Sequence, residues 1–353
     1  MSKPLDSLLT RQWFKLICGA SYQYLPVIRN LALVYTLAGA DCIDMAADPA
    51  VVNAAREGIK VALNLSSNFN PNANHAARNI TNSQPPTPWV MVSINNVEDL
   101  HFRKAQFDAI ACPPTCDRPC ISACPTQAIQ FSDRFQGVRD ELCYGCGRCL
   151  PLCPVQIIHT REQSYDLEDI ADMAIDAIEI HTQPWRVDEF RHLWQRLAPL
   201  IVNLKLVAVS FPDCDNLKEY LLALLDCMQP LPNQLIWQTD GRPMSGDIGN
   251  GTTRAALQLC QKVLGLQLPR GFVQLAGGTN ASTVAKLRAA NIEASGVAYG
   301  SYARKLVSEF LEAGGDRLES HPHLLQQAVN QASSLVAQIK PLKTSRKLSN
   351  TTA

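Results

Sequence analysis

The sequence has no excess of charge of either sign. Its 353 residues contain 32 Lys and Arg residues and 32 Asp and Glu residues, so the formal net charge is zero. A protein whose main ligand is a nucleic acid or an acidic membrane normally carries a strongly basic surface. The sequence therefore predicts no nucleic-acid partner. It also lacks an apolar run of the length that crosses a bilayer, which predicts no transmembrane segment.

Three further features are missing. No signal-peptide pattern opens the chain, so we expect a cytoplasmic protein. The seven histidines show neither H-x3-H nor H-x-x-E-H spacing, so the sequence indicates no metal site built on histidine. No nucleophile lies beside a base, and no lysine stands out for Schiff-base chemistry. The sequence thus predicts no catalytic residues and leaves open whether the protein is an enzyme.

Cysteine, in contrast, is abundant and concentrated. Eight of the thirteen cysteines fall between Cys112 and Pro154. The second half of this stretch has the pattern C-x2-C-x2-C-x3-C-P, and the first half has the variant C-x3-C-x3-C-x3-C-P. Two such runs in tandem are typical of a ferredoxin-like module with two iron–sulfur clusters, in which the fourth cysteine of each run ligates the other cluster.

This rule assigns the ligands of the two clusters. Cluster one is predicted on Cys112, Cys116, Cys120 and Cys153. Cluster two is predicted on Cys143, Cys146, Cys149 and Cys124. Both are expected to be [4Fe–4S], although the irregular opening at Cys112 leaves [3Fe–4S] as an alternative for cluster one. Zinc needs only four ligands per site, and disulfides need an oxidising compartment, so both fit the pattern less well.

Outside the cysteine stretch, apolar runs alternate with helical patterns. The runs are 14–18, 41–47, 89–94, 177–182, 204–211, 233–241, 271–279 and 293–301. Eight strand–helix units of continuous apolar strands predict a TIM-like (β/α)8 barrel, with a doubly wound open sheet as the alternative. The α+β cysteine module would interrupt the barrel after its third strand. We expect a barrel of residues 1–101 and 164–340, a module of 102–163 and a flexible tail of 341–353.

The last two predicted strands end in small residues that suit an anion. Gly277, Gly278, Gly300 and Ser301 would present backbone N–H groups near helix starts, as in the phosphate sites of many barrels. Arg242, in a long loop after the sixth strand, could hold the same ligand. A flavin or a quinone is therefore a candidate cofactor at the mouth. Polar residues at other strand ends, including Asp44, Glu179 and His181, are each expected to cap loops.

Three segments together resemble a known family. They are the opening stretch ICGASYQYLPVIRNLALVYTLAGADCIDMAADPAVV, the two cysteine runs, and the loop WQTDGRPMSGDIG. In combination they resemble the light-dependent period (LdpA) family of cyanobacteria over essentially the whole chain. The resemblance implies an iron–sulfur redox protein that carries light-dependent redox information to the circadian clock. It also implies clock-associated partners, namely input and output histidine kinases and the Kai oscillator.

Three functions follow as hypotheses. The protein could be a redox sensor that feeds the clock, or an oxidoreductase that passes electrons through its clusters to a ligand at the barrel mouth. It could also be a scaffold in which the clusters only stabilise the fold. The two-cluster module without a visible catalytic set favours the sensor. The Gly277–Gly278 and Gly300–Ser301 elements and the placement of the module favour the oxidoreductase.

Overall fold

A closed parallel barrel forms the body of the molecule. In a computed structural model, the residues described are 3–67, 85–163, 165–242 and 249–340. The predicted tail 341–353 lies outside them, as does most of the stretch 66–88, which is rich in Asn, Ser and Pro. The barrel strands are β1 (Trp13–Ile17), β2 (Cys42–Ala46), β3 (Trp89–Asn95), β8 (Ala177–His181), β9 (Leu206–Phe211), β10 (Leu235–Asp240), β11 (Phe272–Ala276) and β12 (Gly296–Tyr299).

The strands close in the order β1-β12-β11-β10-β9-β8-β3-β2, and every neighbouring pair is parallel. Because β1 pairs with both β2 and β12, the sheet has no edge. The predicted TIM-like barrel is therefore confirmed, and the open-sheet alternative is excluded.

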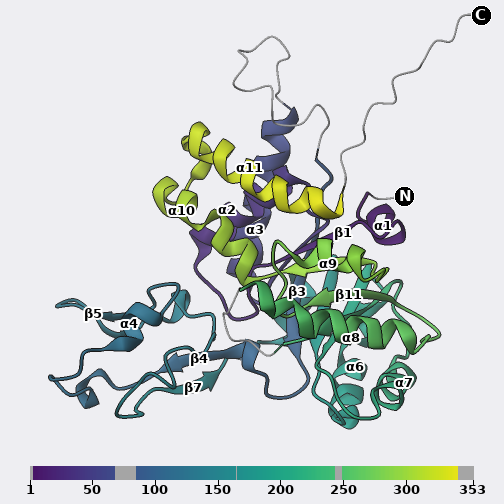
Figure 1. The fold of residues 1–353 in the computed structure, drawn as a ribbon, viewed down its shortest axis with the longest axis horizontal. Helices are drawn as coiled ribbons and strands as arrows, with labels where there is room; N and C mark the ends of the chain where they lie inside the picture. The colour runs from purple at the N-terminus through teal and green to yellow at the C-terminus, as the bar shows by residue number, and fades with distance from the viewer. Residues whose placement is uncertain (1–2, 68–84, 164, 243–248, 341–353) are drawn as a thin grey trace, which may run out of the picture.

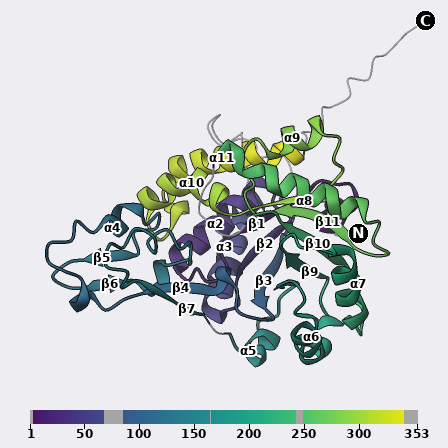
Figure 2. The same cartoon turned by 60° about the horizontal axis from the view of Figure 1, so that its bottom comes forward.

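Helices surround the barrel (Figures 1 and 2). They are α2 (Leu25–Ala38), α3 (Pro49–Ser67), α5 (Leu167–Asp172), α6 (Val187–Ile201), α7 (Leu217–Cys227), α8 (Thr253–Gly265), α9 (Thr283–Ala289), α10 (Ser301–Gly314) and α11 (Pro322–Ile339). Helix α6 shows why they form: Phe190, Trp194 and Leu197 recur at helical spacing and are buried. Helix α2 ends at Gly39, whose φ of 91° reverses the chain at low cost.

The segment that precedes β1 also contributes to the barrel. Residues Lys3–Leu9 form helix α1. Its Leu8 is fully buried and packs with Trp13 and Trp89 in an apolar cluster that fills the N-terminal end of the barrel interior. The segment therefore helps to close the barrel opposite the mouth.

The cysteine module follows β3 and extends from the barrel (Figure 2). Its stem is an antiparallel pair, β4 (Arg103–Gln106) with β7 (His159–Glu162). Within it lie α4 (Pro119–Ala123) and the hairpin of β5 (Ile129–Phe131) with β6 (Gln136–Val138). The apolar pattern VQIIHT at 155–160 favours a strand, but β7 begins only at His159, because the backbone amides of 155–158 are directed at the Cys153 sulfur.

Candidate iron–sulfur module and barrel-mouth site

The cysteines of the module form two groups of neighbours. All thirteen cysteines lie in the described part of the chain, and none of them there is in a disulfide. The Cys120 thiol interacts electrostatically with Cys112, Cys116 and Cys153. The other four, which together line one small cavity, are Cys124, Cys143, Cys146 and Cys149. These are the same two sets that the spacing predicts, and the assignment of each ligand to its cluster stays a prediction.

The surroundings of the sulfurs suit clusters. Burial raises the pKa of the Cys149 thiol to about 12, and the neighbouring Cys146 and Cys143 add to the effect. Four thiolates side by side, two of them buried, would repel one another unless cations joined them. Iron bound to the sulfurs would supply that positive charge, so this donor set fits an iron–sulfur cluster.

Backbone amides supply further stabilisation of the sulfurs. The Ala105 amide donates to Cys143 Sγ at 3.3 Å, and the Ala128 amide donates to Cys124 Sγ at 3.2 Å. At Cys153 burial opposes ionisation, but amides of residues 155–158 outweigh it and lower the pKa of the thiol. Such N–H···S bonds hold ligands in place and help to set cluster potentials.

A glycine fixes the cluster-two loop to the stem of the module. Gly145 has a φ of 73°, and a Cβ atom there would lie 2.0 Å from the Arg103 carbonyl oxygen. Gly147 has a similar φ of 72° but more space around it. Only glycine therefore permits the close approach at position 145.

The same loop contacts the barrel mouth through Tyr144. This residue lies between two predicted ligands and is buried against the barrel core. The Arg304 guanidinium stacks on the Tyr144 ring at 4.6 Å from its centroid. Arg304 also donates to the carbonyl oxygens of Ile17 and Cys18 at 3.0 and 3.1 Å, where β1 ends. The loop that carries the predicted ligands of cluster two is thus linked to the mouth through Tyr144.

The mouth contains a cavity of about 110 Å³. The fold brings all five residues of the predicted anion site to its lining, namely Arg242, Gly277, Gly278, Gly300 and Ser301. Gly277 and Gly278 both have positive φ, and Ser301 begins α10. Tyr144 lines the same cavity. A ligand here would lie next to the cluster-two loop, and its identity remains a prediction.

A charged network fills the barrel interior below the mouth. The fully buried Lys15 ammonium lies 3.0 Å from Asp44 Oδ2 and bonds to Glu179. Burial opposes the charge on Lys15, but the two carboxylates outweigh it and raise the pKa of the ammonium. Burial raises the pKa of Asp44 to about 6, whereas Lys15 and His181 hold the pKa of Glu179 below its ordinary value. A protonated, enclosed lysine does not suit Schiff-base chemistry.

This network continues across the interior through side-chain amides. Gln238 donates to Glu179 and accepts from Gln274, which in turn accepts from the Trp13 indole at 2.6 Å. These hydrogen bonds link the indole of Trp13, at the apolar end of the barrel, to the carboxylate of Glu179 nearer the mouth.

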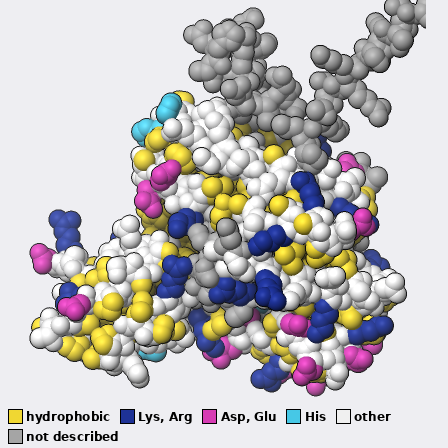
Figure 3. All heavy atoms as spheres, viewed as in Figure 1, with side chains coloured by type: hydrophobic (Ala, Val, Ile, Leu, Met, Phe, Trp, Pro, Cys, Tyr) yellow, Lys and Arg dark blue, Asp and Glu magenta, His cyan; other side chains and the backbone are white. Residues whose placement is uncertain are grey.

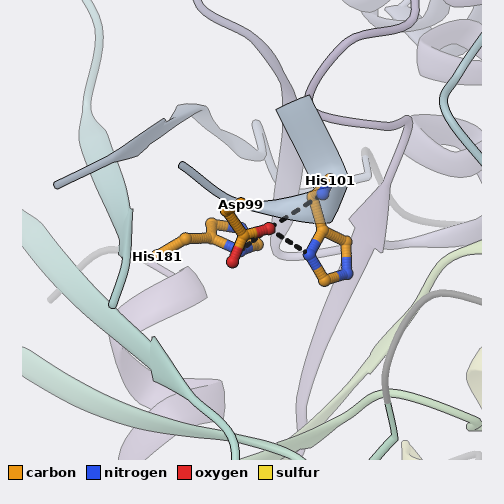
Figure 4. A group of neighbouring side chains, drawn as sticks. All are labelled: Asp99, His101 and His181. Atoms are coloured by element: carbon orange, nitrogen blue, oxygen red, sulfur yellow. Dashed lines mark hydrogen bonds and ion pairs between the residues drawn. The ribbon is translucent and has the colours of Figure 1, made fainter. Parts of the chain in front are cut away.

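Two histidines meet at the top of this network (Figure 4). Asp99 Oδ1 lies 2.7 Å from His101 Nδ1 and 3.9 Å from His181 Nδ1. Burial lowers the pKa of His101, but Asp99 and Asp240 outweigh it and raise this pKa to about 9. Burial opposes ionisation of Asp99, but the two histidines hold its pKa below the ordinary value.

Sequence reasoning missed this network and treated its members one at a time. Of the other polar residues at strand ends, Asp48 caps α3, and the exposed Asp213 pairs with Lys262. Asp44, Glu179 and His181 instead converge inside the barrel. The available signal was one polar residue in the middle of an apolar strand, as in FKLI and AIEIH. In a barrel of parallel strands, the inward-facing residues of different strands form layers, so such polar residues meet in one layer of the interior.

The fold and the module define the class, an iron–sulfur protein in which a ferredoxin-like module is inserted into a TIM-like barrel. The chain is 46% identical to "Light dependent period A" of Synechococcus elongatus, over 96% of this chain and 94% of that protein. Family models for the LdpA Fe-S cluster-binding domain and the Light dependent period A C-terminal domain match residues 112–164 and 169–338. The chain belongs to the Light dependent period A family, as its resemblance implied.

Shorter similarities concern the module alone. An uncharacterized ferredoxin of Methanocaldococcus jannaschii is 29% identical over 18% of this chain and 38% of its own length. A ferredoxin of Saccharopolyspora erythraea is 33% identical over 16% of this chain and 52% of its own length.

Among the helices described, none is long and apolar enough to cross a membrane.

Proposed function

We propose that the protein is a redox sensor whose two clusters report the light-dependent redox state of the cell to the circadian clock. The observation that supports this most directly is the contact between Tyr144, in the cluster-two loop, and Arg304 at the barrel mouth. The partners are those that the resemblance implies, input and output histidine kinases and the Kai oscillator. A cytoplasmic location accords with thirteen cysteines free of disulfides in the described chain.

The magnitude of the electrostatic effect is sufficient for signalling. One electron added about 10 Å from a charged group changes its energy by about 1.7 kcal/mol at an effective dielectric constant of about 20. A change of that size alters a binding equilibrium more than about tenfold. The guanidinium of Arg304 would respond to such a change, and its hydrogen bonds would carry the response to the end of β1.

The test compares the oxidised and reduced forms of the anaerobically purified chain. We expect both clusters to titrate reversibly near the potential of the plastoquinone pool. Amide hydrogen exchange around residues 17–24 and 300–306 should differ between the two redox states. Arg304→Gln should abolish that difference, whereas Arg254→Gln, which alters an exposed arginine on α8, should preserve it. Redox-silent clusters, or identical exchange in both states, would count against the sensor.

A second candidate is an oxidoreductase that passes electrons from cluster two to a flavin, a quinone or another phosphate-bearing ligand. It is supported by the mouth cavity, which Tyr144 shares with Arg242 and the two glycine-containing turns. In Figure 3, Lys and Arg side chains gather where the module adjoins the barrel, which would suit an anion. A flavin absorption spectrum in the purified chain, lost in Gly278→Val, would favour this function over the sensor.

A further inference from the structure

Three side chains at the barrel mouth are arranged as ligands around a common point. Asp99 precedes the short 3-10 helix η2 (Leu100–Phe102), His101 lies within it, and His181 ends β8. One ligand atom of each lies within 4.8 Å of the other two. Figure 4 shows the Asp99 carboxylate bonded to the backbone and ring nitrogens of His101, with the His181 side chain beside it. All three residues lie outside the cysteine runs.

The outer nitrogens of the histidines face carboxylates. His181 Nε2 lies 2.9 Å from Glu179 Oε1, and His101 Nε2 lies 3.6 Å from Asp240 Oδ2. If each Nε2 carries the ring proton, each Nδ1 presents its lone pair towards Asp99 Oδ1. Metal-binding histidines typically donate their other N–H to a carboxylate in this way. Gln183 fixes the Asp99 carboxylate from behind, donating to Oδ2 at 2.6 Å.

The charge of the surroundings favours a cation. Four carboxylates lie in this interior, those of Asp44, Asp99, Glu179 and Asp240, and Lys15 is the ammonium buried among them. Lys15 already pairs with Asp44 and Glu179, so the histidines are the groups that balance Asp99 and Asp240, and buried charge without a partner is costly. A dication beside Asp99 would offset more of this charge than a single proton on one imidazole.

We propose that Asp99 Oδ1, His101 Nδ1 and His181 Nδ1 bind a divalent transition-metal ion, separate from the iron–sulfur clusters. Two imidazole nitrogens and one carboxylate suit Mn²⁺, Fe²⁺, Co²⁺ or Zn²⁺ better than Ca²⁺ or Mg²⁺, which prefer oxygen ligands. His101 and His181 both line the cavity of about 110 Å³, so the remaining positions on the ion face a space large enough for water. The inference does not depend on the proposed sensor function.

Manganese tests the site, because thiolates prefer softer ions. The cluster-loaded chain is titrated with Mn²⁺, and the electron paramagnetic resonance signal of the free ion is followed. We expect one bound Mn²⁺ per chain in the wild type. His181→Ala and Asp99→Ala should each weaken the binding at least tenfold. His192→Ala, which removes an exposed histidine from α6, should bind as the wild type does.

A second variant protects the test against misfolding. His181 is buried, so His101→Ala, at a more exposed position, is measured in parallel, with circular dichroism and cluster absorbance as checks of folding. Absence of bound Mn²⁺ in the wild type overturns the proposal. Wild-type affinity in both folded histidine variants overturns it as well. Neither result would change the absorbance of the iron–sulfur clusters. A failure of the metal-site proposal can therefore be told apart from a failure of the proposed sensor function.

Discussion

At the scale of single residues, the two sets of four cysteines make the ligand assignment testable. Cys153 is near Cys120, although it lies in the other sequence run. We therefore predict that Cys153→Ser disrupts the cluster held by Cys116 and Cys120 more than its neighbour. The measurement is iron content together with electron paramagnetic resonance of the reduced protein. Cys149→Ser is the matched control and should disrupt the other cluster. Loss of only the Cys149 cluster in Cys153→Ser would show that the cross-ligation is wrong.

Gly145 provides a second test at this scale. Gly145→Ala places a methyl group against the Arg103 carbonyl and forces alanine into a left-handed conformation. The conformation alone costs about 1–2 kcal/mol. Gly147→Ala incurs that same cost without the clash, since the closest atom to its Cβ is 3.6 Å away.

We expect Gly145→Ala to lose iron from cluster two under conditions in which Gly147→Ala retains it. The iron content of each variant after anaerobic gel filtration measures the difference. Equal retention in both variants would mean that the contact between the cluster-two loop and β4 does not hold the cluster in place.

At the scale of secondary-structure elements, an ion pair ties α2 to the segment between α10 and α11. The Arg29 side chain is 6% exposed and bonds through both terminal nitrogens to Glu319, which is 17% exposed. Arg29 also bonds to Glu57 of α3, but that carboxylate is 47% exposed. Glu319→Gln should therefore lower the free energy of unfolding by about 1.5–3 kcal/mol at pH 7. Glu57→Gln should lower it by less than about 1 kcal/mol.

The effect of Glu319 depends on pH with a definite sign. The hydrogen bond from Arg29 lowers the pKa of Glu319 below its ordinary 4.5. The carboxylate therefore contributes stability above pH 4.5, and this contribution is lost as the pH falls through the lowered pKa of the folded state. Urea unfolding followed by circular dichroism should show wild type and Glu319→Gln converging in acid. A difference that is constant from pH 7 to pH 4 and below would assign the effect to packing.

The elements of the barrel could be predicted because each depends on local pattern. A continuous apolar run such as 204–211 indicates a buried parallel strand, whichever strands it pairs with in the sheet. The interior network could not be predicted in this way, since Lys15, Glu179 and Gln238 come from three strands and meet only when the barrel closes. His101 and His181 are likewise 80 positions apart and satisfy no short motif. The cluster ligands, in contrast, could be predicted from the sequence, because the spacing of the cysteines along the chain itself indicates iron–sulfur ligation.

At the scale of the whole molecule, the barrel and the module differ in what holds them together. The barrel has a large continuous core of aliphatic and aromatic side chains. The buried core of the module is small, and four of its eight side chains are cysteines, namely Cys120, Cys143, Cys149 and Cys153. We therefore expect the module to depend on iron for its stability, as small metal-binding domains do.

Removal of the clusters should consequently unfold the module and spare the barrel. After anaerobic chelation of iron, we expect trypsin to cleave at Arg134 and Arg148, while far-UV circular dichroism keeps most of the helical signal. The stem pair β4–β7 joins the module to the barrel at neighbouring points, so cleavage within the loop leaves the barrel strands paired. Mass spectrometry of the fragments locates the cuts. If peptides from β9–β11 appear as fast as peptides from 107–158, the barrel cannot fold without the clusters, and the scaffold hypothesis would gain support.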